Sequence, residues 1–456
     1  MNICVVGTGY VGLVAGTGLA DFGMNVICVD NDETKIEALQ NGEVPIYEIG
    51  LAELIDRNVR QKRLSFTTNL ADAIDKSLVI YIAVGTPELP DGSVNLEYFD
   101  KVGEEIGRAM NDYKVIVNKS TVPVGSAKRL RGIIRETQQL PIEFDVVSNP
   151  EFLREGSAVQ DFTHPDRIIL GSDSARAIAI LKDIYRPLYL LETPFIITNN
   201  ETAEMIKYAS NGMLALRISY INEIANLCDK VGADVYDVAR AVGMDKRIGS
   251  KFLHPGPGFG GSCLPKDVAA LNNIAQAYDY DFKLARAILD VNKIQKAQIV
   301  EMAEGFFGSL NGKKVALLGL AFKQNTDDMR ESPALYIIDG LKAAGAEINA
   351  YDPIALTTAK QATNGVNFCE DAFSACEDAS LAIVATDWNE FRNLDLAKLK
   401  EVMAEPNLYD TRNMFNLEHL KKLGYSYLTM GRGGHLIRRE AEYEHDFDAL
   451  ASKQEC

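Results

Sequence analysis

The sequence predicts an α/β protein with two Rossmann-like, doubly wound parallel-sheet domains, joined by a long central helix and a small helical domain. Three observations predict this class. Short apolar runs rich in β-branched residues alternate with helical segments as far as residues 144–147. One helical pattern without proline then covers residues 201–230. A second alternation of strands and helices follows a polar break at residues 310–314.

The N-terminal segment predicts a complete βαβ unit. A buried strand at residues 2–6 leads into a glycine turn and a helix that ends near Phe22. A second strand at residues 25–29 ends at Asp30. Strand, turn, helix, strand and terminal acid together are typical of a dinucleotide-binding fold. Further buried strands are expected at residues 78–84, 114–118 and 144–147.

The middle of the chain is predicted to be helical. The helix at residues 201–230 is apolar around most of its circumference, which suits a spine between domains or a subunit interface. Further helices are expected at residues 235–242 and from Lys266 to about Glu304.

The second α/β unit is predicted to lack the usual phosphate motif. Its strands are expected at 315–320, 347–351 and 381–385, and one of its helices at 333–344. Its first turn, residues 319–322, has no G-x-G-x-x-G pattern, so we interpret it as a divergent Rossmann-like unit for a different nucleotide.

Composition excludes several function classes. The chain has 456 residues, and 47 basic against 64 acidic residues give a net charge of −17. Such a surface repels phosphate backbones and anionic lipids, so we expect neither nucleic acid nor membrane as a partner. The seven cysteines show no C-x-x-C spacing, and no H-x-x-x-H pair occurs, so no metal is expected. No apolar run is long enough for a membrane span, and a cytoplasmic location is the default expectation.

The glycine turn predicts dinucleotide binding. Gly7 allows a tight turn, Gly9 lets the backbone approach a pyrophosphate, and Gly12 permits close packing of helix and strand. The phosphates would then lie at the helix N-terminus. Asp30, at the end of the second strand, is placed to accept both ribose hydroxyls.

The residues after the second strand favour NAD over NADP. The stretch at 30–33 is acidic, would repel a 2′-phosphate, and offers no arginine. Lys35 either reaches the ribose or a phosphate or is an ordinary solvated lysine.

Two segments that follow predicted strands are candidates for the ligand crevice of an open α/β sheet. Ser120 and Thr121 begin one of them, and either could instead cap a helix. The other, residues 149–156, holds two carboxylates four residues apart, Glu151 and Glu155. On an ordinary exposed helix this spacing would not indicate a site, but after a predicted strand both residues are candidates.

Lys207 and Asn211 lie four residues apart and so share one face of the long helix. That helix is largely apolar, so both side chains need partners, whether structural or functional.

The most informative segment is the glycine-rich stretch at 256–267. Its glycines expose backbone N–H groups as a cradle for an anion. Pro265 fits the first position of a following helix, which puts Cys263 just before a helix N-terminus, where the dipole favours a thiolate. Lys266 or Lys207 would lower the thiol pKa further.

An inert buried cysteine is the usual alternative, and Cys4 and Cys28 fit it because they lie in predicted core strands. Cys263 does not, because a glycine-rich loop is not core. Asp267 follows one helical turn later, placed to exchange a proton. A nicotinamide and a nucleophilic thiolate can together oxidise an aldehyde through a thiohemiacetal and a thioester that water hydrolyses.

With these motifs the sequence resembles the UDP-glucose/GDP-mannose dehydrogenase family, over nearly the whole chain to about residue 435. The segments that carry the resemblance are GTGYVG (7–12), STVPVG (120–125), NPEFLREG (149–156), Lys207 with Asn211, GFGGSCLPKD (258–267) and AFKQNTDDMRESPA (321–334). The resemblance implies the oxidation of a C6 alcohol to a carboxylate by two hydride transfers to two NAD.

The resemblance also implies residue roles. Cys263 is expected to be the covalent nucleophile, and Lys207 and Asn211 to hold the developing oxyanion. Asp267 and a water positioned with Thr121 are expected to manage protons, and Glu155 to assist thioester hydrolysis.

Binding residues follow in the same way. The residues expected to contact NAD are Gly7, Gly9, Tyr10, Val11, Gly12, Asp30, Lys35, Thr86, Ser120, Thr121, Glu155, Cys263 and Arg330. The residues expected to contact the nucleotide sugar are Glu151, Phe152, Leu153, Arg154, Glu155, Lys207, Asn211, Arg247, Phe252, His254, Gly256, Gly258, Phe259, Gly260, Lys323 and Arg412.

The expected domains are an NAD-binding Rossmann domain at 1–199, a central helical dimerisation domain at 200–309, a UDP-sugar-binding Rossmann-like domain at 310–436 and a charged, frayed tail at 437–456. Arg247 resembles an arginine that reaches the partner subunit's substrate, which implies at least a homodimer. The expected reaction converts UDP-glucose to UDP-glucuronate. Alternatives are the same chemistry on another nucleotide sugar such as GDP-mannose, a single-hydride β-hydroxyacid dehydrogenase, and a non-catalytic NAD-binding protein.

Overall fold

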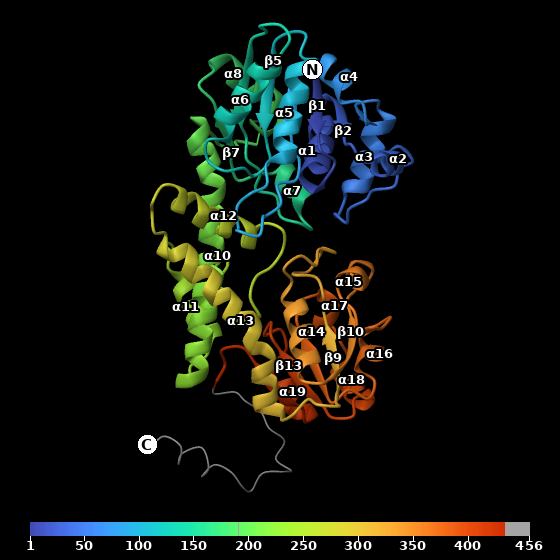
Figure 1. Cartoon of the computed structure of the whole chain (residues 1–456). Coiled ribbons are helices and arrows are strands. Elements are labelled where there is room, and N and C mark those ends of the chain that lie inside the picture. Colours follow the sequence, from blue (N-terminus) through green and yellow to red (C-terminus); the bar gives the residue numbers. More distant parts are fainter. Residues whose placement is uncertain (190, 434–456) are drawn as a thin grey trace. The chain divides into compact units, whose positions relative to one another are not determined.

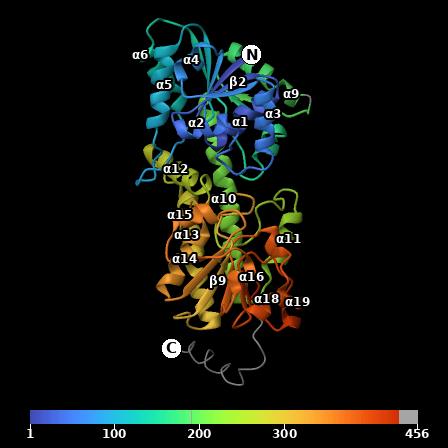
Figure 2. The same ribbon diagram turned by 90° about the vertical axis from the view of Figure 1, so that its right-hand side faces the viewer.

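The computed structural model describes residues 1–189 and 191–433, so the expected tail at 437–456 lies outside the described residues. The chain divides into two compact units (Figures 1 and 2). The first unit combines Met1–Leu214 with Cys263–Ala287, and the second combines Ala215–Ser262 with the described residues from Ile288 onward. Helices α10 (Asn200–Val231) and α13 (Lys283–Phe307) contribute residues to both units.

The first unit is built on an eight-stranded sheet in the order β3-β2-β1-β4-β5-β6-β7-β8. All neighbouring strands run parallel except β6 and β7. The order of the first six strands is that of a doubly wound nucleotide-binding sheet, as predicted. The strands are β1 Asn2–Val6, β2 Asn25–Val29, β3 Leu64–Thr67, β4 Val79–Ile82, β5 Lys114–Asn118, β6 Phe144–Ser148, β7 Ile168–Gly171 and β8 Phe195–Thr198.

Helices cover both faces of this sheet. Alternate residues of each strand point to opposite faces, and because the strands are apolar on both sides, each face must be buried by helices. In β1, Ile3 and Val5 pack with α1, α3, α7 and α8, whereas Cys4 and Val6 pack with α4, α5 and α6. The helices of this unit are α1 Tyr10–Asp21, α2 Glu33–Gln40, α3 Leu51–Arg60, α4 Leu70–Asp75, α5 Glu97–Ala109, α6 Ser126–Thr137, α7 Ala158–Thr163, α8 Ala175–Ile184, α9 Arg186–Tyr189 and α12 Leu264–Ala277.

The second unit has a six-stranded, wholly parallel sheet in the order β11-β10-β9-β12-β13-β14. This repeats the Rossmann order, as predicted. The strands are β9 Lys314–Leu318, β10 Glu347–Tyr351, β11 Asn367–Phe368, β12 Leu381–Val384, β13 Asn407–Asp410 and β14 Ser426–Thr429. The helices are α11 Val235–Met244, α14 Pro333–Ala343, α15 Leu356–Ala362, α16 Ala372–Cys376, α17 Asn389–Arg392, α18 Leu396–Val402 and α19 Leu417–Leu423.

The turn after β9 explains how this unit dispenses with G-x-G-x-x-G. Gly319 has φ +92°, and a Cβ there would lie 2.5 Å from Cβ of Thr386. The carboxylate of Asp352, after β10, accepts hydrogen bonds from the backbone N–H groups of Leu320 and Ala321 at 2.7 and 3.1 Å. An acid at the end of the second strand therefore secures the turn.

The prediction of one helix from Lys266 to about Glu304 is wrong. The structure has α12 and α13, separated by residues 278–282. Asp279 adopts a left-handed conformation with φ +54°, and the N–H of Tyr280 bonds back to the carbonyl of Ala275 at 2.9 Å, which closes α12. Neither proline nor glycine marks this break in the sequence.

Helix α10 matches its predicted limits closely but is not buried on most faces. Met205, Met213, Tyr220 and Leu227 recur every seven or eight residues and are 38 to 54% exposed in the single chain. This spacing puts them along one stripe of the helix. Over the part of the chain that the structure describes, no helix is both long and apolar enough to cross a membrane.

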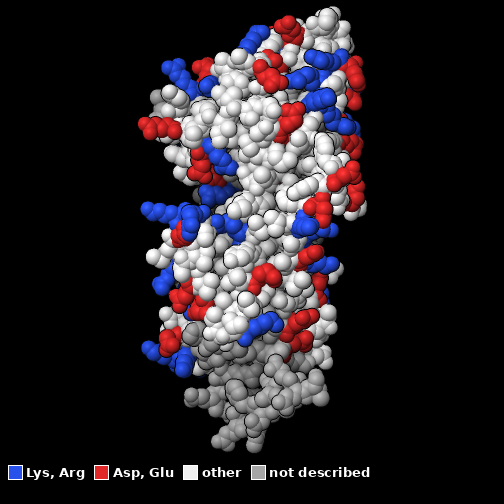
Figure 3. Space-filling view, turned by 90° about the vertical axis from the view of Figure 1, so that its left-hand side faces the viewer, with Lys and Arg blue, Asp and Glu red and all other residues white. Residues whose placement is uncertain are grey.

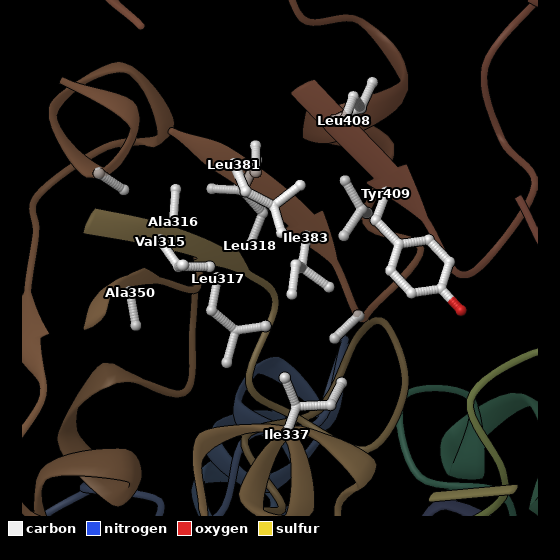
Figure 4. Packing of buried hydrophobic residues seen from close by; sticks show 14 of the residues in the cluster. Val315, Ala316, Leu317, Leu318, Ile337, Ala350, Leu381, Ile383, Leu408 and Tyr409 are labelled. Carbon is white, nitrogen blue, oxygen red and sulfur yellow. The ribbon is translucent and has the colours of Figure 1, made fainter. Parts of the chain in front are cut away.

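A substitution in the core of the second unit tests the packing described for this fold. Leu317 of β9 is fully buried and lies in one cluster with Ile337 and Ile383 (Figure 4). We expect Leu317→Ala to lower the free energy of unfolding by roughly 3 kcal/mol, because it removes buried methyl groups and leaves a cavity. The single tryptophan, Trp388, is buried in the same cluster, so its fluorescence during urea unfolding reports on this unit.

The matched control is Met244→Ala, since that side chain is 77% exposed in the same unit. It is expected to change the unfolding free energy by less than about 0.5 kcal/mol. Equal urea midpoints for the two variants would contradict the packing described here.

Candidate active site

The glycine turn between β1 and α1 is shaped for close approach of a phosphate. Gly7 has φ +100°, and a Cβ there would lie 2.5 Å from the carbonyl oxygen of Ala83. A Cβ on Gly12 would lie 1.9 Å from the carbonyl oxygen of Gly7. Gly9 is the N-cap residue of α1, and among the described residues no side chain caps this helix, so its first N–H groups remain available to a phosphate. This cradle fits the pyrophosphate of a dinucleotide.

Asp30, directly after β2, fixes this turn. Its carboxylate accepts hydrogen bonds from the N–H and hydroxyl of Thr8 at 2.7 and 2.8 Å, and from the N–H of Asp32 at 3.1 Å. Burial raises the pKa of Asp30, but these hydrogen bonds outweigh it and keep the pKa below its usual value. An ionised acid therefore stands where a ribose is expected. Lys35 is half-exposed and lies 3.7 Å from the Asp32 carboxylate.

The segments after β4 and β5 are joined to each other. Thr86 donates to the carbonyl of Thr121 at 2.8 Å, and Ser120 donates to the carbonyl of Val84 at 2.9 Å. The alternative that Ser120 or Thr121 caps a helix is wrong, because α6 begins after Gly125. Both residues instead lie at the carboxyl edge of the sheet.

A buried ion pair links α10 to the segment after β6. Lys207 Nζ lies 2.7 Å from Glu151 Oε1, and the two side chains are 5 and 4% exposed. Burial lowers the pKa of Lys207, but Glu151, with Cys263 and Asp267, outweighs burial and raises it. Burial likewise raises the pKa of Glu151, and Lys207 outweighs it and lowers the pKa. Both groups are therefore charged.

A second pair of side chains joins α10 to α12. Asn211 Nδ2 donates to Asp267 Oδ2 at 2.6 Å, and Lys266 Nζ lies 2.6 Å from Asp267 Oδ1. Asp267 is 1% exposed, and its N–H bonds to the carbonyl of Cys263 at 2.9 Å. Cys263 is partly exposed at the N-cap of α12, with Pro265 in the first turn.

The other cysteine side chains differ from Cys263. Cys4, Cys28 and Cys376 are fully buried, and burial raises the pKa of Cys28 and of Cys376 to about 12. These thiols are therefore inert core groups. Among the described residues, no group of three His, Cys, Asp or Glu side chains is arranged to hold a metal ion.

The segment 149–156 contains charged groups with different surroundings. The guanidinium of Arg167 lies 3.8 Å from the ring centroid of Phe152, whereas Lys207 lies 5.5 Å from it. Arg154 forms an ion pair with Asp161 and is 65% exposed. Leu153 packs against the core of the sheet.

Sequence reasoning missed two buried groups next to these segments. Lys119 donates to Asn149 at 3.3 Å, and burial lowers its pKa to about 8 despite the opposing effect of Glu151. Glu48 accepts hydrogen bonds from Tyr10 and from the N–H groups of Gly156 and Ala158, so it ties α1 to the end of the segment that holds Glu155. Lys119 directly precedes the STVPVG motif, which is a weak signal; Glu48 has none.

In the second unit, amide side chains hold the loop 254–260. Asn222 accepts from the N–H of Gly256 at 2.9 Å, and Gln295 donates to the carbonyl of Gly256 at 2.9 Å. Asn292 bonds both the N–H and the carbonyl of Phe259, at 2.8 and 3.0 Å. These partners come from α10 and α13, and sequence reasoning missed them.

Two basic residues of the second unit, Arg412 and Lys323, differ in their contacts. Arg412 donates to the carbonyls of Ala385 and Phe322 at 2.7 and 3.3 Å, and a Cβ on Gly256 would lie 3.1 Å from its guanidinium. Burial lowers the pKa of Arg412. Lys323 lies 5.7 Å from the ring of Phe322.

Four further predicted residues lie apart from this loop or at its margin. Arg330 pairs with Asp328 at 2.8 Å, and Arg247 pairs with Asp245 and is 88% exposed. Phe252 has a left-handed backbone with φ +62°, and His254 is exposed. Basic and acidic side chains are interspersed on the molecular face shown in Figure 3.

The comparisons with known proteins agree over most of the chain. Residues 1–189 match the NAD binding domain of the UDP-glucose/GDP-mannose dehydrogenase family, 201–294 its central domain, and 316–417 its UDP binding domain. The UDP-glucose 6-dehydrogenase of Bacillus subtilis (strain 168) is 48% identical over 94% of this chain and 93% of its own length. That of Rhizobium meliloti (strain 1021) is 47% identical over 95% of this chain and 100% of its own.

Among solved structures, a UDP-glucose dehydrogenase from the hyperthermophilic archaeon Pyrobaculum islandicum is 36% identical, with a TM-score of 0.88. The match covers 95% of this chain and 97% of that one. The glycine turn, the sheet order, the domain matches and these relatives lead to one conclusion: the chain belongs to the UDP-glucose/GDP-mannose dehydrogenase family.

Proposed function

We propose that this protein oxidises UDP-glucose to UDP-glucuronate in two NAD-dependent steps. The observation that carries the proposal is the set of pairs Lys207–Glu151 and Asn211–Asp267 beside Cys263, in the same unit as the glycine turn. The match to an NAD binding domain and a UDP binding domain, and the two bacterial relatives named UDP-glucose 6-dehydrogenase, support this cofactor and this substrate.

The first unit would hold NAD at its glycine turn, with Asp30 at the ribose. The proposed contacts are Gly7, Gly9, Tyr10, Val11, Gly12, Asp30, Lys35, Thr86, Ser120, Thr121, Glu155, Cys263 and Arg330. NAD, when bound, supplies the acceptor for the hydride that leaves C6 in each oxidation. The protein's own residues bind and orient the sugar and move protons.

In the first oxidation, the C6 hydroxyl loses its proton and C6 loses a hydride, which gives an aldehyde. The cation of Lys207 and the amide of Asn211 stabilise negative charge on the C6 oxygen. Asp267 touches both Asn211 and Lys266, so it is placed to exchange that proton.

In the second oxidation, the thiolate of Cys263 adds to the aldehyde carbon and forms a thiohemiacetal. Loss of a second hydride leaves a thioester. Water then adds to the thioester and breaks the C–S bond, which releases a carboxylate and returns the thiol. Thr121 would orient this water, and Glu155 would accept its proton.

Further residues are proposed to contact the substrate. The proposed residues are Glu151, Phe152, Leu153, Arg154, Phe252, His254, Gly256, Gly258, Phe259, Gly260, Lys323 and Arg412. The four amide hydrogen bonds to Gly256 and Phe259 pre-organise the loop 254–260, so little ordering cost remains when a nucleotide binds.

We also propose that the chain is at least a homodimer that associates through the exposed apolar stripe of α10, with Arg247 reaching the partner's substrate. The proposed working domains are 1–199, 200–309 and 310–436. A cytoplasmic location fits the six described cysteines, which are all free thiols.

The stoichiometry of the reaction tests the function. Purified protein with limiting UDP-glucose is expected to release two NADH per sugar, since an alcohol becomes a carboxylate, and the product mass should be that of UDP-glucuronate. One NADH per sugar would indicate a single-hydride dehydrogenase. Turnover of GDP-mannose but not UDP-glucose would overturn the substrate, and binding without turnover would overturn the activity.

Covalent catalysis is tested by Cys263→Ser. A hydroxyl is a poor nucleophile without an adjacent base, so kcat is expected to fall roughly a thousandfold or more. Binding of NAD and of UDP, followed by calorimetry, should persist because the backbone cradle is unchanged. Cys28→Ser serves as the control for loss of a thiol away from the site; near-normal kcat in Cys263→Ser would refute the thioester.

The dimer is tested by placing charges in the stripe of α10. Met213→Glu with Leu227→Glu is expected to lower the mass measured by light scattering from that of a dimer to that of a monomer, because buried carboxylates oppose association. Met244→Glu, at a more exposed methionine on α11, should leave the mass unchanged. A monomeric wild-type protein would contradict the proposal outright.

A further inference from the structure

A carboxylate that the proposed chemistry does not use lies beneath the β5–α6 segment. Glu204 of α10 is 4% exposed. It accepts hydrogen bonds from the N–H groups of Gly125 and Ala127 at 2.7 and 2.8 Å, and from the hydroxyl of Ser148 at 3.3 Å. Gly125 is the N-cap residue of α6 and Ala127 is the second residue of that helix, so Glu204 caps the helix.

The cap of α6 comes from a distant part of the chain, as does the Glu48 carboxylate at the N–H of Ala158 in α7. Helices α2, α4 and α8 are capped locally, by Asp32, Asn69 and Ser174. Helix α6 has Gly125 at its N-cap, with φ +95° and no side chain. Its cap lies 79 residues away along the chain, so it joins two elements that a local cap would leave independent.

Glu204 also shares its helix face with two proposed catalytic residues. Lys207 and Asn211 follow it by three and seven residues, a spacing that returns to the same side of a helix. Glu204 and Lys207 line one small cavity with Thr121 and Asn118. Asn118 is 3% exposed, and its side-chain oxygen has no hydrogen-bond partner among the described residues.

A purely structural cap would not need a buried carboxylate. Burial raises the pKa of Glu204 to about 7, opposed by its hydrogen bonds to Gly125, Ala127 and Ser148. A serine or asparagine cap serves other helices of the same unit without this desolvation cost.

We propose that Glu204 is a positioning residue, which holds the turn with Ser120 and Thr121 in register with the helix that carries Lys207 and Asn211. The inference rests on the proposed function, since it assigns Ser120 and Thr121 to NAD and to the hydrolytic water. By fixing α6 directly to α10, Glu204 keeps the cofactor side and the oxyanion side of the site at one separation.

The test compares Glu204→Ala and Glu204→Gln with the wild type. Glu204→Ala removes both acceptors, so KM and the dissociation constant for NAD are expected to rise about fivefold or more, and kcat to fall roughly tenfold or more through misplacement of Thr121. Glu204→Gln keeps one oxygen, so it should recover part of both losses. The dissociation constant for UDP, the ligand expected for the matched UDP binding domain at 316–417, should stay within about twofold.

Hydrogen exchange supplies a readout that needs no turnover. Amides of residues 120–130 are expected to exchange faster in Glu204→Ala, with the second unit unchanged. Two controls accompany it: Ser174→Ala removes a helix cap of the same unit, and Glu201→Gln removes a charge from the same turn of α10. Both should keep wild-type KM for NAD.

The outcomes separate the two proposals. The proposed function is overturned if the wild type releases a number of NADH per UDP-glucose other than two. In that case hydrogen exchange and NAD affinity still test the positioning role of Glu204. Unchanged exchange at 120–130 and unchanged NAD affinity in Glu204→Ala overturn the positioning role. Equal losses in Glu204→Ala and Ser174→Ala would reduce Glu204 to an ordinary helix cap and also overturn it.

Discussion

The first unit depends on one constraint, the burial of two opposite charges at Lys207 and Glu151. Transferring a charged side chain from water into the protein interior costs several kcal/mol, and only a well-placed partner of opposite charge offsets this cost. Loss of either partner leaves the other charge uncompensated, at a cost of about 3–5 kcal/mol. The pair therefore stabilises the fold only in one arrangement of α10 and the segment after β6.

An acidic chain that binds two anionic nucleotides must place its few useful positive groups locally. With a net charge of −17, the overall field repels such ligands. The structure provides backbone N–H groups at the glycine turn, the buried cation Lys207 in one unit and the partly buried cation Arg412 in the other. A buried cation is less screened than an exposed one, so a small number of them suffices against the unfavourable background.

Helices and strands were predicted accurately where local sequence signals mark both of their ends. Strands β1, β2, β5 and β10 have their expected limits, because apolar runs end at glycine, acid or polar residues. The gap between α12 and α13 escaped prediction, since its left-handed residue is Asp279 and not a glycine. Four short strands, β7, β8, β13 and β14, were also not predicted from the sequence. A run of four residues is too short for its periodicity to separate a strand from a helix, so only pairing within the sheet defines it as a strand.

The site shows the same division between local and distant information. The sequence made Cys263 a candidate through its glycine-rich segment, and Lys207 through its spacing to Asn211 on an apolar helix. Glu48 and Glu204 lack such a signal, and their partners lie 38 to 110 residues away. An isolated glutamate in an amphipathic segment is normally solvated, and only a fold that brings backbone N–H groups to it makes burial favourable. The residues that hold such a site together are thus the ones that sequence patterns reveal last, because their role arises from the distance that the fold closes.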